Sequence, residues 1–179
     1  MLEKIQTLLA SLSQQNSTEG FCHEIERTYL TGEELKPYIY FEKYKYTRNL
    51  IFQNTKFELM TLCWGPYQET PIHDHSGSLG VMKVIEGELH ETLYKASATD
   101  SYLEEIEERK AVKDSITSIE DSVGFHKIAN KSKQPAISLH LYAKPIESFY
   151  IYNSKNLERC IKIPCFDSEF GEKNQRPTL

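Results

Sequence analysis

From position 38 onward, the chain consists of short segments in which apolar and polar side chains alternate, with no helical pattern between them. The segment KFELMTLCW places Phe57, Leu59, Thr61 and Cys63 on one side, and the segments GELHETLYK and PAISLHLYA alternate in the same way. Alternation with a period of two residues is typical of β-strands whose two faces have different surroundings. Many consecutive strands without intervening helices predict an antiparallel sandwich or barrel.

The N-terminal part of the chain has a different pattern. Apolar residues at helical spacing predict an amphipathic helix over 2–14, and a second short helix is expected over 17–28. Thr31 and Glu34 have the spacing of a capping box, and Pro37 indicates that the helix starting there is short. We therefore predict a mainly β fold, an antiparallel barrel with the N-terminal helices packed on its outside.

Length and composition agree with an ordinary folded domain. The chain has 179 residues, of which 39% are hydrophobic and 26% charged, as in globular proteins. We expect one domain over 1–179, with a helical segment over 1–36 and a β-barrel over 38–165. The acidic stretch 104–108 is expected to be a solvated turn or a short helix face. The four cysteines include no CxxC pair and are expected to be reduced thiols.

Charge and hydropathy narrow the range of partners. The net charge of −5 provides no general attraction to nucleic acid or to an anionic membrane surface. The N-terminal residues lack the apolar core of a signal peptide, and no apolar stretch reaches the length of a membrane span. We expect a cytoplasmic protein that is a monomer and binds neither nucleic acid nor membrane.

Three histidines form the strongest candidate site. His73 and His75 are two residues apart, a spacing that directs both side chains to the same face of a strand, and His126 follows about fifty residues later. Imidazole is the commonest protein ligand for iron, zinc, copper and nickel. We therefore predict a metal site made of these three residues. The glycines that frame the first pair are Gly65, Gly80 and Gly87.

The sequence contains two further groups of polar side chains, and the members of each group are expected on the same face of one strand. In SLHLY, the side chains of Ser138, His140 and Tyr142 alternate with an apolar face of isoleucine and leucine. If the apolar face packs on the core, the polar face must look at solvent or at a polar pocket. Tyr46 and Arg48 form a second pair on one face in KYTRN, where an ordinary solvated arginine is the alternative.

These motifs resemble those of known families. The pair Gly65…His73-x-His75…Gly87 and Gly124-x-His126-x-x-x-Asn130 resembles the two motifs of the cupin superfamily, whose members are antiparallel β-barrels or jelly rolls with a metal inside. The succession YTRNL, LCWG, IHDH, SVGFH and SLHLY is, more specifically, similar to the cysteine dioxygenase family. This similarity runs from Tyr46 to Tyr142, which is more than half of the chain.

The resemblance implies a chemistry for the histidines. It implies a mononuclear non-haem Fe(II) site with His73, His75 and His126 as ligands, where both atoms of O2 are added to the thiol of L-cysteine to give cysteine sulfinate. Three neutral ligands leave the charge of the ion uncompensated, unlike the two-histidine, one-carboxylate set of many iron oxygenases. Such a site favours a substrate that coordinates as an anion.

The resemblance also implies roles for the other polar residues. Arg48, with Tyr46 beside it, would bind the substrate carboxylate, because a guanidinium can donate two parallel hydrogen bonds to a carboxylate. Tyr142 would place its hydroxyl near the substrate and oxygen. His140 would hold Tyr142 in place through a hydrogen-bond chain that includes Ser138.

Three other functions remain compatible with the sequence. The first is a dioxygenase of 3-mercaptopropionate or another small thiol, a group in which a glutamine resembles the residue at position 48. Arg48 favours cysteine over that group, because a buried charge left without a partner is costly. The second is a zinc or nickel cupin of another enzyme class. The third is a non-catalytic cupin that binds a metal or small molecule.

Gly80 generates a first prediction. In many cupins a glutamate ligand occupies this place, and in the animal cysteine dioxygenases a cysteine there is linked by a thioether to the tyrosine that matches Tyr142. Gly80 has no sulfur, so the chain resembles the bacterial type with an unlinked tyrosine. We expect the intact protein to have the mass of the unmodified sequence by mass spectrometry. A deficit of two hydrogens would contradict this expectation.

Overall fold

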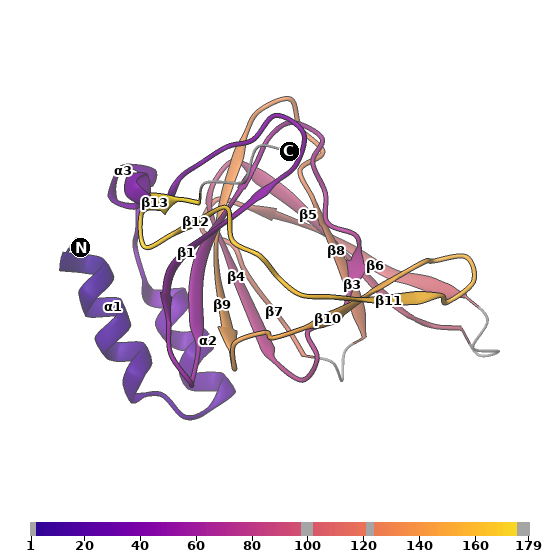
Figure 1. The fold of residues 1–179 in the computed structure, drawn as a ribbon, viewed down its shortest axis with the longest axis horizontal. Helices are drawn as coiled ribbons and strands as arrows, with labels where there is room; N and C mark the ends of the chain where they lie inside the picture. Colours follow the sequence, from indigo (N-terminus) through magenta and orange to yellow (C-terminus); the bar gives the residue numbers. More distant parts are fainter. Residues whose placement is uncertain (1–2, 98–101, 121–123, 175–179) are drawn as a thin grey trace.

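The structure is a computed structural model that describes residues 3–97, 102–120 and 124–174. Helices begin the chain, and strands make up most of the rest (Figure 1). The helical elements are α1 (Glu3–Gln14), α2 (Thr18–Arg27), α3 (Gly32–Leu35) and a short 3-10 helix, η1 (Lys36–Tyr38). The predicted helices over 2–14 and 17–28 are therefore confirmed in their described residues. Across residues 3–97, 102–120 and 124–174, no helix is long and apolar enough to cross a membrane.

The strands form two sheets, which are antiparallel except where β12 runs parallel to β1. The first sheet has the order β13-β12-β1-β2-β9-β4-β7, and the second has the order β11-β10-β3-β8-β5-β6. Strands of the first sheet are β1 (Thr47–Gln53), β2 (Glu58–Trp64), β4 (Leu79–Glu86), β7 (Ile116–Ile119), β9 (Ala136–Ala143), β12 (Ser168–Glu169) and β13 (Glu172–Lys173). Strands of the second sheet are β3 (Ile72–His73), β5 (Glu88–Ala96), β6 (Leu103–Val112), β8 (Phe125–Ala129), β10 (Phe149–Tyr152) and β11 (Arg159–Lys162).

The two sheets enclose a common interior, as the predicted barrel requires. A buried cluster there includes Met60 and Met82 from the first sheet and Leu89 and Ile128 from the second. Side chains from both sheets meeting in one cluster are the signature of a closed or sandwiched β core. The prediction of a mainly β antiparallel barrel is thus confirmed.

The helices cover the outer face of the first sheet (Figure 1). Apolar side chains of α1 and α2, such as Leu8 and Ile25, pack in one buried cluster with Leu139 and Leu141 of β9. The capping box at Thr31 is present, and the chain passes from α3 directly into η1. The outside position predicted for the helices is therefore confirmed, and it leaves the barrel interior open for a site.

Strand β9 is buried on both faces. It lies between β2 and β4, so it is a central strand and not an edge. Its isoleucine and leucine side chains pack under the helices, whereas Ser138, His140 and Tyr142 point to the other side and are buried there as well. The polar face predicted from SLHLY therefore looks into the barrel and not at solvent.

The prediction for residues 104–108 is wrong. This stretch lies inside β6, which pairs along its length with β5 and forms an edge of the second sheet. Between Leu103 and Ala111 most of its side chains are exposed, so no apolar alternation marks it as a strand. Charged side chains on an exposed edge strand also discourage pairing with another chain, which gives a physical reason for the composition.

Lys83 joins the helical layer to the barrel. Its side chain is buried on β4, and its ammonium donates to the carbonyl oxygens of Glu26 and Thr28 at 2.7 and 2.6 Å. These carbonyls lie at the C-terminal end of α2, where the helix dipole carries partial negative charge. Lys83 therefore holds α2 on the sheet through charge-assisted hydrogen bonds.

We predict that Lys83→Met lowers the free energy of unfolding by about 2–3 kcal/mol, because buried carbonyls lose their donor. The measurement is denaturant unfolding followed by circular dichroism. Lys113→Met is the matched control, since this lysine is exposed in the turn after β6 and should change stability by less than about 0.5 kcal/mol. Equal stability of the two variants would show that the Lys83 contacts contribute nothing.

Candidate active site

Strand pairing brings the three histidines together. In the antiparallel pair of β3 and β8, His73 lies directly opposite His126. His75 lies just beyond the end of β3. Between the two, Asp74 turns away and accepts a hydrogen bond from the backbone nitrogen of Tyr150 at 2.9 Å. With Asp74 directed outward by this contact, side chains continue to alternate between the two faces beyond the end of β3. His73 and His75 therefore both point into the barrel interior.

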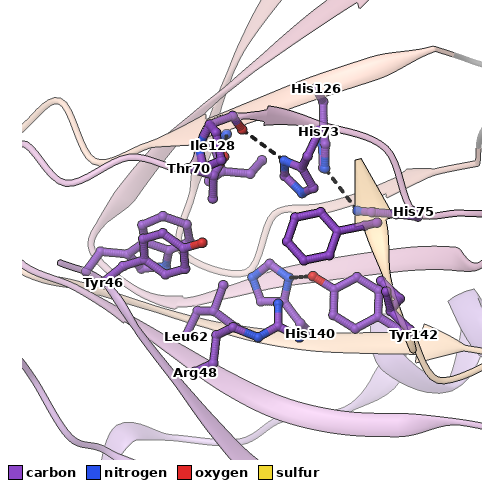
Figure 2. Close-up of a pocket in the computed structure, with 14 residues that line it drawn as sticks. Tyr46, Arg48, Leu62, Thr70, His73, His75, His126, Ile128, His140 and Tyr142 are labelled. Atoms are coloured by element: carbon purple, nitrogen blue, oxygen red, sulfur yellow. Dashed lines mark hydrogen bonds between the residues drawn. The ribbon is translucent and has the colours of Figure 1, made fainter. Parts of the chain in front are cut away.

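The three imidazoles are close enough to share one cation (Figure 2). One ligand atom from each of His73, His75 and His126 lies within 4.8 Å of the others. The Nε2 atoms of His75 and His126 are 3.1 Å apart. His75 and His126 are buried, and His73 is half-buried. The predicted cluster is therefore present as a geometric unit.

Hydrogen bonds at the back of two rings direct their lone pairs inward. Nδ1 of His126 lies 2.9 Å from a carboxylate oxygen of Glu91, and Nδ1 of His73 lies 3.0 Å from the carbonyl oxygen of Pro71. Both partners are acceptors, so each Nδ1 carries the proton and each Nε2 offers a lone pair. Burial and the neighbouring His126 hold the pKa values of His73 and His75 well below the ordinary range. Neutral imidazoles of this kind fit a divalent metal ion.

Glu91 is a site residue that the sequence reasoning did not identify. It lies on β5, it is 1% exposed, and its second carboxylate oxygen has no hydrogen-bond partner among the described residues. The signal was present, because Glu91 stands between Leu89 and Leu93 on an otherwise apolar strand face. A charged residue in such a position usually has a buried partner.

Arg48 points into the same cavity and is not a solvated surface residue. Its Nε and Nη2 atoms are buried and have no hydrogen-bond partner among the described residues. The nearest carboxylate belongs to Glu58, whose Oε1 lies 3.8 Å from Nη2. Burial raises the pKa of Glu58, although the nearby guanidinium opposes this effect. Arg48 therefore keeps N–H donors available for an anion.

Tyr46 lies beside Arg48, as predicted, and lines the same cavity. Its ring stacks on that of Trp64, with the centroids 4.8 Å apart and the planes at 22°. Burial raises the pKa of the Tyr46 hydroxyl, and Arg48 opposes the shift. Stacking of this kind limits the rotation of the Tyr46 side chain and keeps its hydroxyl at the cavity wall.

A chain of hydrogen bonds runs along the inner face of β9, and Figure 2 shows its last bond, between His140 and Tyr142. The indole Nε1 of Trp64 donates to the Ser138 hydroxyl at 2.9 Å, and this hydroxyl lies 2.8 Å from Nε2 of His140. Nδ1 of His140 lies 3.4 Å from the hydroxyl of Tyr142. The predicted contact among the three β9 residues is therefore present, and Trp64 extends it by one member.

The indole of Trp64, which is the first donor, determines which group donates in each hydrogen bond of this series. The indole nitrogen only donates, so Ser138 accepts from Trp64 and can give its own proton to Nε2 of His140. Burial and the nearby Arg48 lower the pKa of His140 to about 3, so this ring is neutral. With Nε2 accepting from Ser138, the single ring proton is assigned to Nδ1. His140 then donates to Tyr142, and the Tyr142 proton is left to point into the cavity. Burial raises the pKa of Tyr142 to about 12, so the hydroxyl remains a donor.

Gly80 lies directly opposite Tyr142 in the register of β4 and β9. A Cβ atom at this position would come within 2.3 Å of Cε1 of His75. Any side chain at position 80 would therefore require the His75 ring to move. The absence of a side chain lets the imidazole of His75 lie against the β4 backbone.

These residues surround a small cavity that is partly open to solvent. Polar groups lie on two sides of it, with His73, His75 and His126 on one and Arg48, His140 and Tyr142 on the other (Figure 2). Apolar side chains complete the wall, namely Leu62, Ile128, Ile146 and Phe149. A small cavity with a few convergent polar groups suits a compact, charged ligand that reaches from a metal to a guanidinium.

We predict that Glu91→Gln lowers the affinity for a divalent metal by about 10- to 100-fold, because the His126 ring loses its anionic partner. The measurement is competition with a chromophoric chelator. Glu88→Gln is the matched control on the same strand, since Glu88 pairs with Lys110 at the surface. If the two variants bind metal equally well, Glu91 does not support the site.

Comparison with known proteins agrees with this arrangement. Residues 5–155 match the family described as cysteine dioxygenase type I. Cysteine dioxygenase type 1 of Bos taurus is 37% identical over 139 residues, which cover 76% of this chain and 70% of the bovine protein. The human enzyme of the same name is 35% identical over 144 residues, which cover 79% of this chain and 72% of the human protein.

Similarity to a solved double-stranded β-helix protein from Klebsiella pneumoniae is looser, with a TM-score of 0.49, 16% identity, and coverage of 75% of this chain and 96% of the other. The chain belongs to the cysteine dioxygenase type I family of oxidoreductases.

Proposed function

We propose that this protein holds one Fe(II) ion and adds both atoms of O2 to the thiol of free L-cysteine, giving cysteine sulfinate. Membership of the cysteine dioxygenase type I family supports the activity. The observation that carries the choice of substrate is the position of Arg48, which lines the same cavity as the histidines and whose buried Nε and Nη2 atoms have no hydrogen-bond partner among the described residues. A ligand with a thiolate at one end and a carboxylate at the other satisfies both sides of this cavity.

We propose His73, His75 and His126 as the residues that hold the iron. Their inward nitrogen atoms converge, and among the described residues no carboxylate joins them. When bound, Fe(II) supplies the redox chemistry that activates O2, and the thiol itself supplies the electrons that its oxidation requires. The Glu91 carboxylate accepts a hydrogen bond from Nδ1 of His126. This bond keeps the ring oriented and makes its Nε2 a better ligand for a metal.

Substrate recognition in this proposal rests on Arg48 and Tyr46. The guanidinium donates to the substrate carboxylate, and this pairing satisfies donors that are otherwise buried without partners. The Tyr46 hydroxyl, held by stacking of its ring on Trp64, lies at the same wall of the cavity. Binding at two ends orients the thiol toward the histidines, and such positioning is a large part of catalysis for a small substrate.

The residues of β9 keep a proton donor at the cavity. Because Ser138 and His140 pass hydrogen bonds toward Tyr142, the tyrosine proton is free to be donated to substrate or to an oxygen atom of the developing sulfinate. His140 and Ser138 act through Tyr142, so they are positioning residues. The high pKa of Tyr142 keeps this donor protonated at neutral pH.

The test is to load the protein with Fe(II), supply L-cysteine or 3-mercaptopropionate, and follow O2 consumption together with sulfinate formation. We expect equal amounts of O2 consumed and sulfinate formed from L-cysteine. We expect Arg48→Gln to lower kcat/KM for L-cysteine by about 100-fold or more, because the charged pair with the carboxylate is lost. A matched control is Arg109→Gln, an arginine exposed on β6 that should leave kcat/KM unchanged.

Other outcomes would replace the proposal. Preference of the wild-type protein for 3-mercaptopropionate would change the substrate to an amine-free thiol. Absence of O2 uptake with both thiols, in a protein that binds zinc tightly, would favour a zinc enzyme or a non-catalytic metal-binding cupin.

A further inference from the structure

A segment from the C-terminal part of the chain lies beside β1, the strand that carries Arg48. Residues 163–174, which we call the C-terminal strap, follow β11, run along β1 and contain β12 and β13 (Figure 1). In β12, Ser168 pairs with Asn49 in parallel register, one residue after Arg48. The strap is thus attached to the strand that carries the guanidinium proposed to bind substrate.

Asp167 attaches the strap directly to the backbone of Arg48. The Arg48 nitrogen donates to the Asp167 carboxylate at 3.0 Å, and the Asp167 nitrogen donates to the Arg48 carbonyl oxygen at 2.7 Å. The other carboxylate oxygen accepts from the ammonium of Lys45 at 2.5 Å. Asp167 is only 5% exposed, so these bonds are shielded from competing water.

Phe166 provides a surface for the guanidinium itself. The central carbon of the Arg48 guanidinium lies 5.7 Å from the centroid of the Phe166 ring and 5.7 Å from that of the Tyr142 ring. Contact with an aromatic face attracts a cation without using its N–H groups. The strap can therefore restrain Arg48 and still leave its donors for a ligand.

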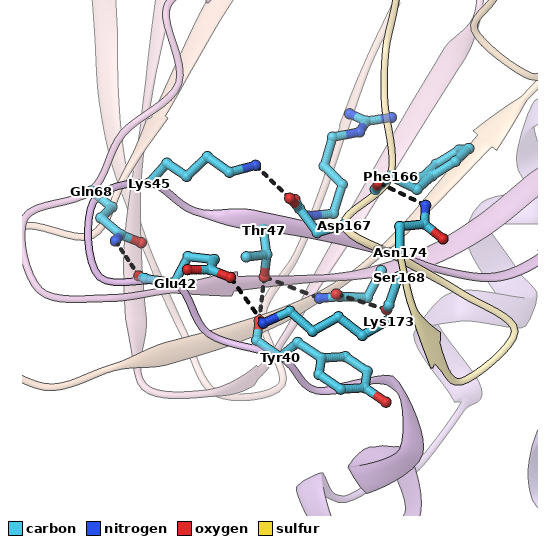
Figure 3. Close-up of polar contacts among 12 residues, drawn as sticks. Tyr40, Glu42, Lys45, Thr47, Gln68, Phe166, Asp167, Ser168, Lys173 and Asn174 are labelled. Carbon is cyan, nitrogen blue, oxygen red and sulfur yellow. Dashed lines mark hydrogen bonds and ion pairs between the residues drawn. The ribbon is translucent and has the colours of Figure 1, made fainter. Parts of the chain in front are cut away.

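Further hydrogen bonds join the strap to itself and to β1 (Figure 3). The side chain of Asn174 donates to the carbonyl oxygen of Phe166 at 3.0 Å, and its backbone nitrogen donates to the carbonyl oxygen of Asp167 at 2.9 Å. Ser168 donates to the side chain of Asn49 at 2.9 Å. These bonds fix the backbone of Phe166 and of the two residues that follow it. The position of the Phe166 ring beside Arg48 is therefore defined by the strap.

Residues of the strap also line an outer pocket beside the cavity. A shallow outer pocket, lined by Lys45, Cys165 and Asp167 among others, shares Tyr46 and Arg48 with the inner cavity. The strap therefore lies at the side of the cavity that Arg48 lines.

We propose that Phe166 and Asp167 are positioning residues for Arg48, and that they set the affinity of the site for thiols that bear a carboxylate. The inference rests on the proposed function, because it takes Arg48 as the partner of the substrate carboxylate. An unrestrained arginine loses much of its rotational freedom when it binds a ligand, and this loss weakens binding. The strap restrains the side chain before the ligand arrives.

The test compares two thiols that differ in the carboxylate alone. L-Cysteine and 2-aminoethanethiol are titrated into the Fe(II)-loaded protein without oxygen by calorimetry, and KM and kcat for L-cysteine are measured separately. We expect Phe166→Leu to weaken L-cysteine binding and raise KM by about 5- to 10-fold, with kcat within about twofold. Binding of 2-aminoethanethiol should change by less than about twofold. Phe170→Leu, on the exposed tip of the same strap, is the matched control and should leave both thiols unaffected.

A second variant keeps the test decisive if Phe166→Leu does not fold. Asp167→Ala removes the acceptor of the Arg48 nitrogen, and it should give the same selective loss for L-cysteine. Equal weakening of both thiols, or no weakening of either, would overturn the inference. An Arg48→Ala variant separates the two proposals: if wild type and Arg48→Ala bind both thiols alike, the proposed role of Arg48 fails as well. If Arg48→Ala loses the preference for L-cysteine and the strap variants keep it, the inference alone fails.

Discussion

Burial of β9 on both faces is the constraint on which the rest of the structure depends. Its apolar face packs under α1 and α2, so its polar face must lie in the barrel interior. Buried hydroxyl and imidazole groups are stable there only when they are hydrogen-bonded, and the chain from Trp64 through Ser138 and His140 to Tyr142 meets that requirement. The outer helices therefore contribute to the site without touching it, because they decide which face of β9 turns inward.

The charges of the interior are arranged around a space left for a ligand. Glu91 is joined to His126, whereas Arg48 and Glu58 are 3.8 Å apart, beyond a hydrogen bond. A guanidinium that made close bonds to Glu58 would have fewer donors for a carboxylate ligand. Arg48 is instead held by contacts of its guanidinium with the rings of Tyr142 and Phe166. These contacts restrain the side chain without using its N–H groups.

Much of the fold and of the candidate site could be predicted from local patterns. Alternation indicated the strands, helical spacing indicated α1 and α2, and the spacing of His73 and His75 indicated a shared direction. Residues 104–108 were misassigned because an exposed edge strand carries no apolar alternation. Glu91 and Trp64 were missed because their roles depend on partners on other strands, although a glutamate on an apolar strand face was a usable signal.

The sequence by itself determined which chemistry was available: three imidazoles, a guanidinium, and a polar strand face of serine, histidine and tyrosine. These properties are local, because side-chain type and periodicity are read within a few residues. Only the tertiary structure decided which of these groups meet. The pairing of β3 with β8 sets His73 opposite His126, and the strap reaches Arg48 from 119 positions away in the chain. Such contacts depend on strand register and on the path of the whole chain, which follow from the packing of all strands together and not from any one segment.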